Sequence, residues 1–480
     1  MRTTPAAWDV NALLAEIADI GRDRLRGGYS RHVFDPSERS LREWFVTRSR
    51  DLDLDVEHDK NSNIWSYWGP RGNDTIATGS HLDSVPGGGA FDGPLGVASA
   101  LSAVAAMKAD GIGPRRPLAV VAFAEEEGSR FGVACLGSRL ATGAIDPARA
   151  RALTDADGVT FREAAAEFGL DPDGIGRDDA RLASLAAFVE LHVEQGRGLV
   201  DMGAPVALAS GILAHGRWRL AFTGEGNHAG TTVMADRRDP VAAAAAAILA
   251  AREIAAARDN PAAGSHARAT VGRVVPLPGG TNVIASRADA WLDVRAGTDA
   301  AVRDLIAEIA GAIRAGAAEH RCDVEITEES YAGATIFDPA LRDRLSAALV
   351  TRQPPRGEPF GGEPLRGEPA FAAPLRGEPA FAAPFGEEPG AAPPVLATGA
   401  GHDAGVLASV LPTAMLFVRN PTGVSHSPYE TATAADCRAG ADSLRSVLEA
   451  LLGLGLRRTP SYTLRRGVTG NGPRSRRRRE

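Results

Sequence analysis

The chain contains 480 residues, of which 44% are hydrophobic and 24% charged, and its formal net charge is −7. This length and composition predict a globular protein of two domains, and the acidic body of the chain gives no electrostatic sign of nucleic-acid binding. Three widely spaced cysteines, no signal-peptide pattern and no apolar run long enough to span a bilayer predict a cytoplasmic protein without disulfides or a membrane partner.

Strand-like and helical patterns alternate from about residue 10 to 210. The apolar run Leu118–Ala124 predicts a buried strand, and residues 97–108 and 161–168 predict helices. Such alternation is typical of an α/β sheet with crossover helices. We therefore expect residues 1–212 to form the first part of one α/β domain.

A different pattern begins near residue 213. Residues 217–224 alternate as a half-exposed strand, and Asp239-Pro240 then predicts the start of a long alanine-rich helix, with aspartate at the N-cap and proline at N1. Further predicted elements are strands at 268–275, 290–295 and 322–327 and a helix at 301–315. These elements predict a smaller α+β domain at 213–328, inserted into the first.

The first pattern resumes near residue 336, so 329–456 is the predicted second part of the larger domain. Within it, LRGEPAFAAP occurs twice in tandem, and the proline-rich segment 354–394 predicts disorder. Residues 457–480 carry nine arginines and one glutamate. A charge run of this kind is typical of a solvated, disordered tail, with contact to an anionic surface as the lesser alternative.

Four loops with acids or histidines each follow an apolar strand. They are HLDSVPGGGAFDGPLGV at 81–97, EEEGSRF at 125–131, HVEQG at 192–196 and GVSHSPYE at 423–430. In an open α/β sheet ligands gather at the carboxyl ends of strands, and histidine with carboxylate is the donor set of a divalent metal. Taken singly, a strand-end histidine is more often structural and a glutamate triplet is more often a solvated turn. All four together favour a single site.

The same motifs, with GNHAGTT at 226–232, TNVI at 281–284 and GAGHDA at 399–404, resemble the hydantoinase/carbamoylase family. That family lies within the di-metal aminoacylase and carboxypeptidase superfamily. The resemblance covers about residues 10–455 apart from 354–394. It implies a mixed-sheet α/β catalytic domain with an inserted α+β dimerisation or lid domain, and a homodimer.

The resemblance also implies two divalent ions, zinc or manganese, bridged by Asp92. It assigns His81 and His192 to one ion and Glu127 and His426 to the other. Glu126 would be the general base and Glu125 a loop residue. Asp83 would accept the N–H of the His81 imidazole and fix its tautomer.

The implied substrate contacts come from both domains. His228 would donate to the oxyanion, commonly from the neighbouring subunit in this family, and the remaining contacts would be Gln195, Asn282, Arg295, Gly399 and His402. Arg295 suits a bidentate clamp on a carboxylate, although it could also be a salt-bridge partner, and Asn282 could serve only its own turn. Five other histidines lack such company and are expected to be structural or on the surface: His32, His58, His215, His266 and His320.

The resemblance predicts an amidohydrolase acting on linear, non-peptide amide bonds. The leading expectation is hydrolysis of the ureido group of allantoate in purine catabolism, releasing ammonia and carbon dioxide. The alternative is an N-carbamoyl-L-amino-acid hydrolase or β-ureidopropionase. A metal-free scaffold protein is disfavoured because all five ligand positions carry ligand residues.

Overall fold

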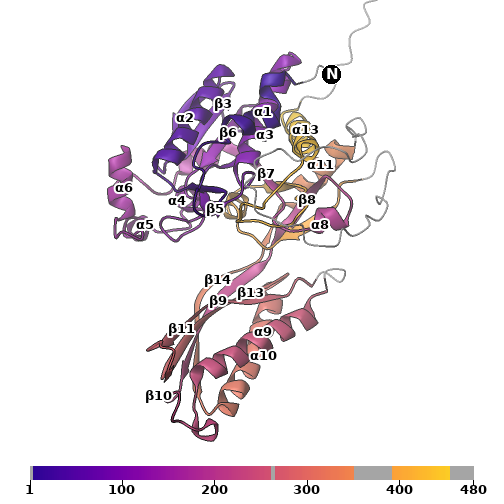
Figure 1. The fold of residues 1–480 in the computed structure, drawn as a ribbon. Helices are drawn as coiled ribbons and strands as arrows, with labels where there is room; N and C mark the ends of the chain where they lie inside the picture. The colour runs from indigo at the N-terminus through magenta and orange to yellow at the C-terminus, as the bar shows by residue number, and fades with distance from the viewer. Residues whose placement is uncertain (1–3, 261–264, 351–391, 454–480) are drawn as a thin grey trace, which may run out of the picture.

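The computed structural model describes residues 4–260, 265–350 and 392–453. Figure 1 shows two bodies, a larger one at the top and a smaller one below it, joined by the long strands of the smaller body. The predicted repeat at 354–394 falls almost entirely outside the described residues, and the tail at 457–480 falls entirely outside them.

The larger body is built on a nine-stranded sheet of the order β15-β8-β17-β7-β4-β6-β3-β2, with β16 beside β8. The four central strands run parallel, and β2 and β3 run antiparallel to their neighbours. Strand β8 pairs antiparallel with β17 and β15 but parallel with β16, so the predicted mixed α/β sheet is confirmed. The strands are β2 (Asp55–His58), β3 (Ile64–Trp68), β4 (Thr75–His81), β6 (Leu118–Phe123), β7 (Leu185–Val193), β8 (Val206–Ile212), β15 (Thr335–Ile336), β16 (Val395–Thr398) and β17 (Thr413–Val418).

Helices cover both faces of this sheet. One face packs on the central helix α3 and on α1, α2, α11 and α13, and the other packs on α7, α8 and α12. Strands β4, β6 and β17 are buried along their whole length, which explains the continuous apolar runs of β6 and β17. These helices are α1 (Val10–Glu16), α2 (Pro36–Asp51), α3 (Pro94–Ala109), α7 (Asp179–Ser184), α8 (Gly198–Asp201), α11 (Pro339–Val350), α12 (Asp403–Leu407) and α13 (Ala434–Leu451).

A satellite layer lies at one end of the sheet. Three short helices, α4, α5 and α6, form their own apolar cluster with Val33 and Phe34. Strand β1 pairs antiparallel with β5 inside the glycine-rich segment after β4. The elements here are β1 (Tyr29–Arg31), β5 (Ser84–Gly88), α4 (Leu136–Thr142), α5 (Pro147–Arg151) and α6 (Phe161–Phe168). The short helix η1 (Ala6–Trp8) lies instead against α1 and α3.

The smaller body is an antiparallel sheet of order β11-β13-β9-β14 with α9 and α10 packed on one face. The Asp239 carboxylate accepts from Val241 N at the start of α9, as the N-cap prediction requires. Strands β10 and β12 pair at the end of this body farthest from the larger sheet (Figure 1). The elements are β9 (Ala214–Thr223), β10 (Asn227–His228), η2 (Met234–Asp236), α9 (Pro240–Arg258), β11 (Arg268–Leu277), β12 (Val283–Ile284), β13 (Arg287–Ala296), α10 (Asp299–Glu319) and β14 (Asp323–Ala332).

Helix α9 is long and apolar enough, by length and composition alone, to cross a membrane. Its buried side chains are mainly alanines, among them Ala243, Ala247 and Ala251, which pack in the core of the smaller body. The core helix of a soluble protein meets the same length and composition criteria, and the packing of α9 on the sheet accounts for its apolar character.

Candidate metal centre

Five predicted ligands meet at the carboxyl ends of the central strands. His81 ends β4 and His192 lies next to the end of β7, while Glu127 follows β6 and His426 follows β17. These four strands are neighbours in the sheet, and their parallel register brings the loops after them to one edge. Asp92 joins them from the loop that leads into α3.

The two oxygens of Asp92 face two separate groups of ligands. Asp92 Oδ1 lies 3.5 Å from His81 Nε2 and 3.2 Å from His192 Nε2. Asp92 Oδ2 lies 3.5 Å from His426 Nε2, which in turn is 3.3 Å from Glu127 Oε2. One carboxylate therefore contributes an oxygen to each of two three-residue groups, which is the arrangement of a bridged pair of cations.

The donor atoms fit divalent cations. The Nε2 atoms of His81 and His192 and the Oε1 atom of Glu127 are buried and have no hydrogen-bond partner in the described structure. Leaving a buried polar atom without a partner costs about 1–3 kcal/mol, and coordination to a cation removes that cost. Mixed imidazole and carboxylate ligands suit zinc and manganese alike.

The electrostatics of the site also favour cations. Burial, together with the nearby Asp92 carboxylate, raises the pKa of Glu127 to about 8, and burial raises the pKa of Glu126 well above its usual range. Burial would also raise the pKa of Asp92, but the neighbouring imidazoles of His192 and His81 hold it well below its usual range. Closely spaced, buried carboxylates are stabilised as anions by bound positive charge.

The backbone oxygen and the carboxylate of Asp83 have different partners in the site. His81 Nδ1 lies 3.0 Å from the backbone oxygen of Asp83 and 3.6 Å from its carboxylate. The carboxylate instead accepts from the backbone N–H groups of Glu126 and Glu127, at 3.2 and 3.1 Å. Asp83 therefore faces the imidazole N–H of His81 through its backbone oxygen, and its carboxylate orients the glutamate turn.

The three consecutive glutamates have three different surroundings. Glu125 has a left-handed backbone (φ 54°), and its carboxylate accepts from Arg130 N and Phe131 N, so it stabilises the loop as expected. The buried Glu126 carboxylate lies with Oε2 3.7 Å from His81 Nε2 and accepts from Cys135 Sγ through Oε1. Glu127 alone contacts His426.

Glu430 lies beside the ligand groups and was not singled out from its sequence motif. Its buried Oε1 accepts from Phe91 N and Asp92 N, each at 3.0 Å, and its Oε2 accepts from Ser425 Oγ at 3.3 Å. Glu430 thereby ties the loop of Asp92 to the loop of His426. Its position four residues after His426 was the only signal in the sequence.

Two predicted substrate residues line the same edge of the sheet. Gln195 Nε2 donates to Asp92 Oδ2 at 2.8 Å and lies 3.3 Å from His426 Nε2. The buried ring of His402 lies 4.5 Å from the ring of His192, with its Nε2 unpartnered among the described residues. Both side chains are therefore beside the ligand groups.

Glu190 is a second residue that the sequence analysis missed. Its carboxylate and the imidazoles of His192 and His402 each have one atom within 4.8 Å of the others. The carboxylate also accepts hydrogen bonds from Ser80 Oγ at 2.8 Å and from Ala404 N at 2.9 Å. The signal for it was an acid in the middle of an otherwise apolar strand. Its hydrogen bonds fasten the strand of His192 to the helix that follows His402.

The remaining predicted contacts lie in or against the smaller body. Arg295, at the end of β13 next to the larger body, donates to the Gly399 carbonyl and pairs with Asp293 at 2.7 Å. In β10, His228 pairs with Val283 of β12, and the next residue, Ala229, donates its N–H to the carbonyl of Asn282. Strand β10, which contains His228, lies at the far end of the smaller body (Figure 1), so a single chain does not bring this strand to its own metal ligands.

Comparison with known proteins identifies the family. The model of Peptidase family M20/M25/M40 matches residues 77–450. An N-carbamoyl-L-amino acid amidohydrolase of Geobacillus stearothermophilus is 35% identical over 90% of this chain and 95% of its own. The allantoate amidohydrolase of Escherichia coli strain K12 is 29% identical over 92% of this chain and 96% of its own. A crystal structure of a hydantoinase/carbamoylase family amidase from Burkholderia vietnamiensis superposes with a TM-score of 0.72 at 29% identity, covering 93% of this chain and 97% of the amidase. The chain belongs to Peptidase family M20/M25/M40, within its hydantoinase/carbamoylase branch of amidohydrolases.

Proposed function

We propose that the protein hydrolyses the ureido group of N-carbamoyl-L-amino acids, R–NH–CO–NH2, in the cytoplasm. The observation that carries this proposal is the double ligand group bridged by Asp92, with the carboxylate of Glu126, a member of neither group, beside it. Two divalent ions held there would lower the pKa of water and polarise the ureido carbonyl. The ureido carbon is a poor electrophile, so such activation is needed.

Glu126 acts as the general base. Its buried carboxylate, next to the ligand His81, takes a proton from the attacking water while the water oxygen bonds to the ureido carbon. Glu126 then delivers that proton to the substrate nitrogen as the C–N bond breaks. The products are the free amine and carbamate, and carbamate decomposes to ammonia and carbon dioxide.

Substrate binding would use residues of both bodies. Arg295 pairs with both carboxylate oxygens of Asp293 and contacts Gly399 of the larger body, so it would bind the substrate carboxylate by exchanging Asp293 for it. Gln195 and His402 lie beside the ligand groups and suit contacts to the ureido amide. His228 and Asn282 would complete the site of a second subunit in a homodimer, since both lie far from the metal ligands of their own chain.

Allantoate is the second candidate substrate, although it was the first expectation from the sequence. The segment FVRNPTGVSHSP at 417–428 supports it, because this segment resembles bacterial enzymes assigned to allantoate. We rank N-carbamoyl-L-amino acids above allantoate because the N-carbamoyl-L-amino acid amidohydrolase from Geobacillus is 35% identical to this chain, whereas the allantoate amidohydrolase from Escherichia coli is 29% identical. Both substrates carry the same ureido group and require the same chemistry.

The deciding experiment is a substrate panel with ammonia release as the readout. Purified protein is supplied with manganese or zinc and tested on N-carbamoyl-L-amino acids, their D-enantiomers, N-carbamoyl-β-alanine and allantoate. We expect the highest kcat/KM for an N-carbamoyl-L-amino acid, with the D-enantiomer as the matched control. Preference for allantoate would replace the first candidate by the second, and no ammonia release from any of these ureido compounds would refute both.

A further inference from the structure

The buried thiol of Cys135 contacts the carboxylate of Glu126. Cys135 is 2% exposed and directly precedes α4, and its Sγ donates to Glu126 Oε1 at 3.3 Å. It is the one hydrogen bond that this carboxylate receives from the part of the chain that the structure describes. Because the thiol occupies Oε1, the other oxygen, Oε2, is the one that faces His81, at 3.7 Å.

The backbone fastens the same two residues to each other. The N–H groups of residues 135, 136 and 137 donate in turn to the carbonyls of residues 126, 125 and 124, at 2.6, 3.0 and 2.9 Å. This short ladder holds the two segments in one register, so neither can slide along the other. The thiol of Cys135 and the side chain of Glu126 therefore leave the backbone from fixed positions, and their contact follows from the ladder.

The backbone of Cys135 has a conformation that is uncommon for a residue with a side chain. Its φ is 56°, in the left-handed region that glycine adopts most readily. Glycine would form the same turn with less strain, so the turn alone does not call for a side chain at this position. The contact of the thiol with Glu126 does account for one.

A thiol is a suitable hydrogen-bond donor to a general base. Burial, together with the nearby carboxylates of Glu126 and Asp403, raises the pKa of the Cys135 thiol well above its usual range, so the thiol keeps its proton and donates a hydrogen bond. An S–H group is a weak donor, whereas a guanidinium or ammonium group would stabilise the charged carboxylate and make it a weaker base. The thiol therefore orients the carboxylate and leaves most of its basicity intact.

We propose that Cys135 is a positioning residue for the hydrolysis: its thiol holds Oε1 of Glu126, so that Oε2 receives the proton of the attacking water. The inference rests on the proposed function, in which Glu126 is the general base. Cys135 acts only through Glu126 and has no hydrogen bond to any of the five ligand side chains in the described structure. Without the thiol, the carboxylate rotates about its last bond and Oε2 leaves the position from which it accepts the proton.

Steady-state kinetics of the full chain, loaded with metal, test the proposal. Cys135→Ala removes the donor, and we expect kcat to fall about five- to tenfold, the effect of one lost hydrogen bond, with KM and metal content as in wild type. Cys135→Gly suits the left-handed backbone but also lacks the donor, so it should be as slow as Cys135→Ala. Cys135→Ser supplies a hydroxyl donor and should restore most of kcat. If Cys135→Gly is as active as wild type, Cys135 serves only the turn and the proposal is overturned.

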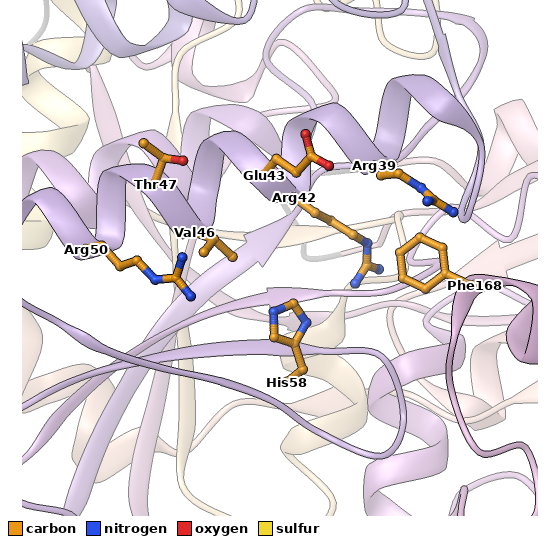
Figure 2. A pocket seen from close by; sticks show the side chains of 8 residues that line it. All are labelled: Arg39, Arg42, Glu43, Val46, Thr47, Arg50, His58 and Phe168. Carbon is orange, nitrogen blue, oxygen red and sulfur yellow. The ribbon is translucent and has the colours of Figure 1, made fainter.

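Two control variants lie outside the metal centre. Cys437→Ala truncates another buried cysteine, in α13, and should leave kcat unchanged. Thr47→Ala truncates an exposed side chain at the cavity along α2, and Figure 2 shows that the residues lining this cavity include none of the metal ligands. If Cys437→Ala lowers kcat as much as Cys135→Ala does, the loss reflects packing in general, which would contradict a positioning role.

A second measurement reports the contact itself and does not depend on turnover. The infrared S–H stretching band of Cys135, assigned by its loss in Cys135→Ala, should lie at lower wavenumber than that of a thiol without a hydrogen bond. Glu126→Gln should move the band to higher wavenumber, because an amide oxygen is a weaker acceptor than a carboxylate. A band that Glu126→Gln leaves in place would refute the positioning role. Failure of the proposed function would show differently, as absent turnover of every ureido compound by the wild-type protein.

Discussion

At the scale of single residues, Glu126 and Glu127 are adjacent in sequence but serve different neighbours. The backbone N–H of each donates to one oxygen of Asp83, which fixes the direction in which both side chains leave the turn. Glu127 then faces His426, and Glu126 faces His81 from inside the site. Two residues of the same type, adjacent in sequence, are thereby directed to different neighbours and suit different roles, Glu127 as a metal ligand and Glu126 as the general base.

Exchanging each glutamate for glutamine separates the two roles. Glu126→Gln keeps the shape of the side chain but cannot accept a proton, so metal content should stay near two ions per chain while kcat falls by roughly 10²–10⁴. Glu127→Gln removes an anionic ligand and should lose metal from one site as well as activity. Metal analysis of the two purified variants distinguishes them. Loss of metal from Glu126→Gln alone would mean that the roles are exchanged.

Glu430 should control metal affinity without contacting metal. Glu430→Ala leaves the buried N–H groups of Phe91 and Asp92 without their acceptor and frees the loop of Asp92, so we expect metal affinity to fall about 10–100-fold. Titration of the metal-free protein with manganese or zinc measures the change. Glu319→Ala, at an exposed position ending α10, is the control. Unchanged affinity in Glu430→Ala would show that the two loops hold their places independently.

At the scale of elements, the sequence predicts those helices and strands whose boundaries are set by residues close to them in the chain. The helix expected at 161–168 is observed as Phe161–Phe168, where Thr160 and Glu163 form a capping box. The strands β8, β15 and β16, in contrast, were not predicted individually. Their pairing joins segments more than 100 residues apart, as in the contact of Val395 with Leu208. Pairing of that kind depends on the assembled sheet and leaves little signal in a local pattern.

Close packing of α3 on the sheet gives an element-scale prediction. A Cβ at Gly96 would lie 2.3 Å from the backbone oxygen of Leu191, next to the ligand His192. Gly96→Ala should therefore push α3 from β7 and lower the free energy of unfolding by about 1–3 kcal/mol. Thermal denaturation measures this loss. Gly113→Ala is the control, because a Cβ there meets open space, and an equal melting temperature for both variants would contradict the prediction.

At the scale of the whole molecule, the strand order explains which parts of the site could be predicted. The ligands follow neighbouring parallel strands, so loops distant in sequence converge, and all five predicted ligands come together. Glu190 and Glu430 escaped prediction because their partners, such as Ala404 and Phe91, are over 200 residues away in the chain. The place of His228 is likewise a property of the assembled chain, since β10 lies at the end of the smaller body opposite to the metal ligands.

The distance between β10 and the metal ligands of the same chain predicts that the active site is shared between two subunits. If His228 serves the site of a partner subunit, Glu126→Gln and His228→Ala are each inactive alone but complement each other when mixed. A mixed dimer contains one site with an intact Glu126 and an intact His228 from the other chain. Random exchange makes half of the dimers mixed, so about a quarter of wild-type activity should return. The measurement is ammonia release after the two variants are unfolded and refolded together, with each variant refolded alone as the control. If His228 serves its own chain instead, no mixed dimer has a complete site, and the mixture stays as inactive as its components.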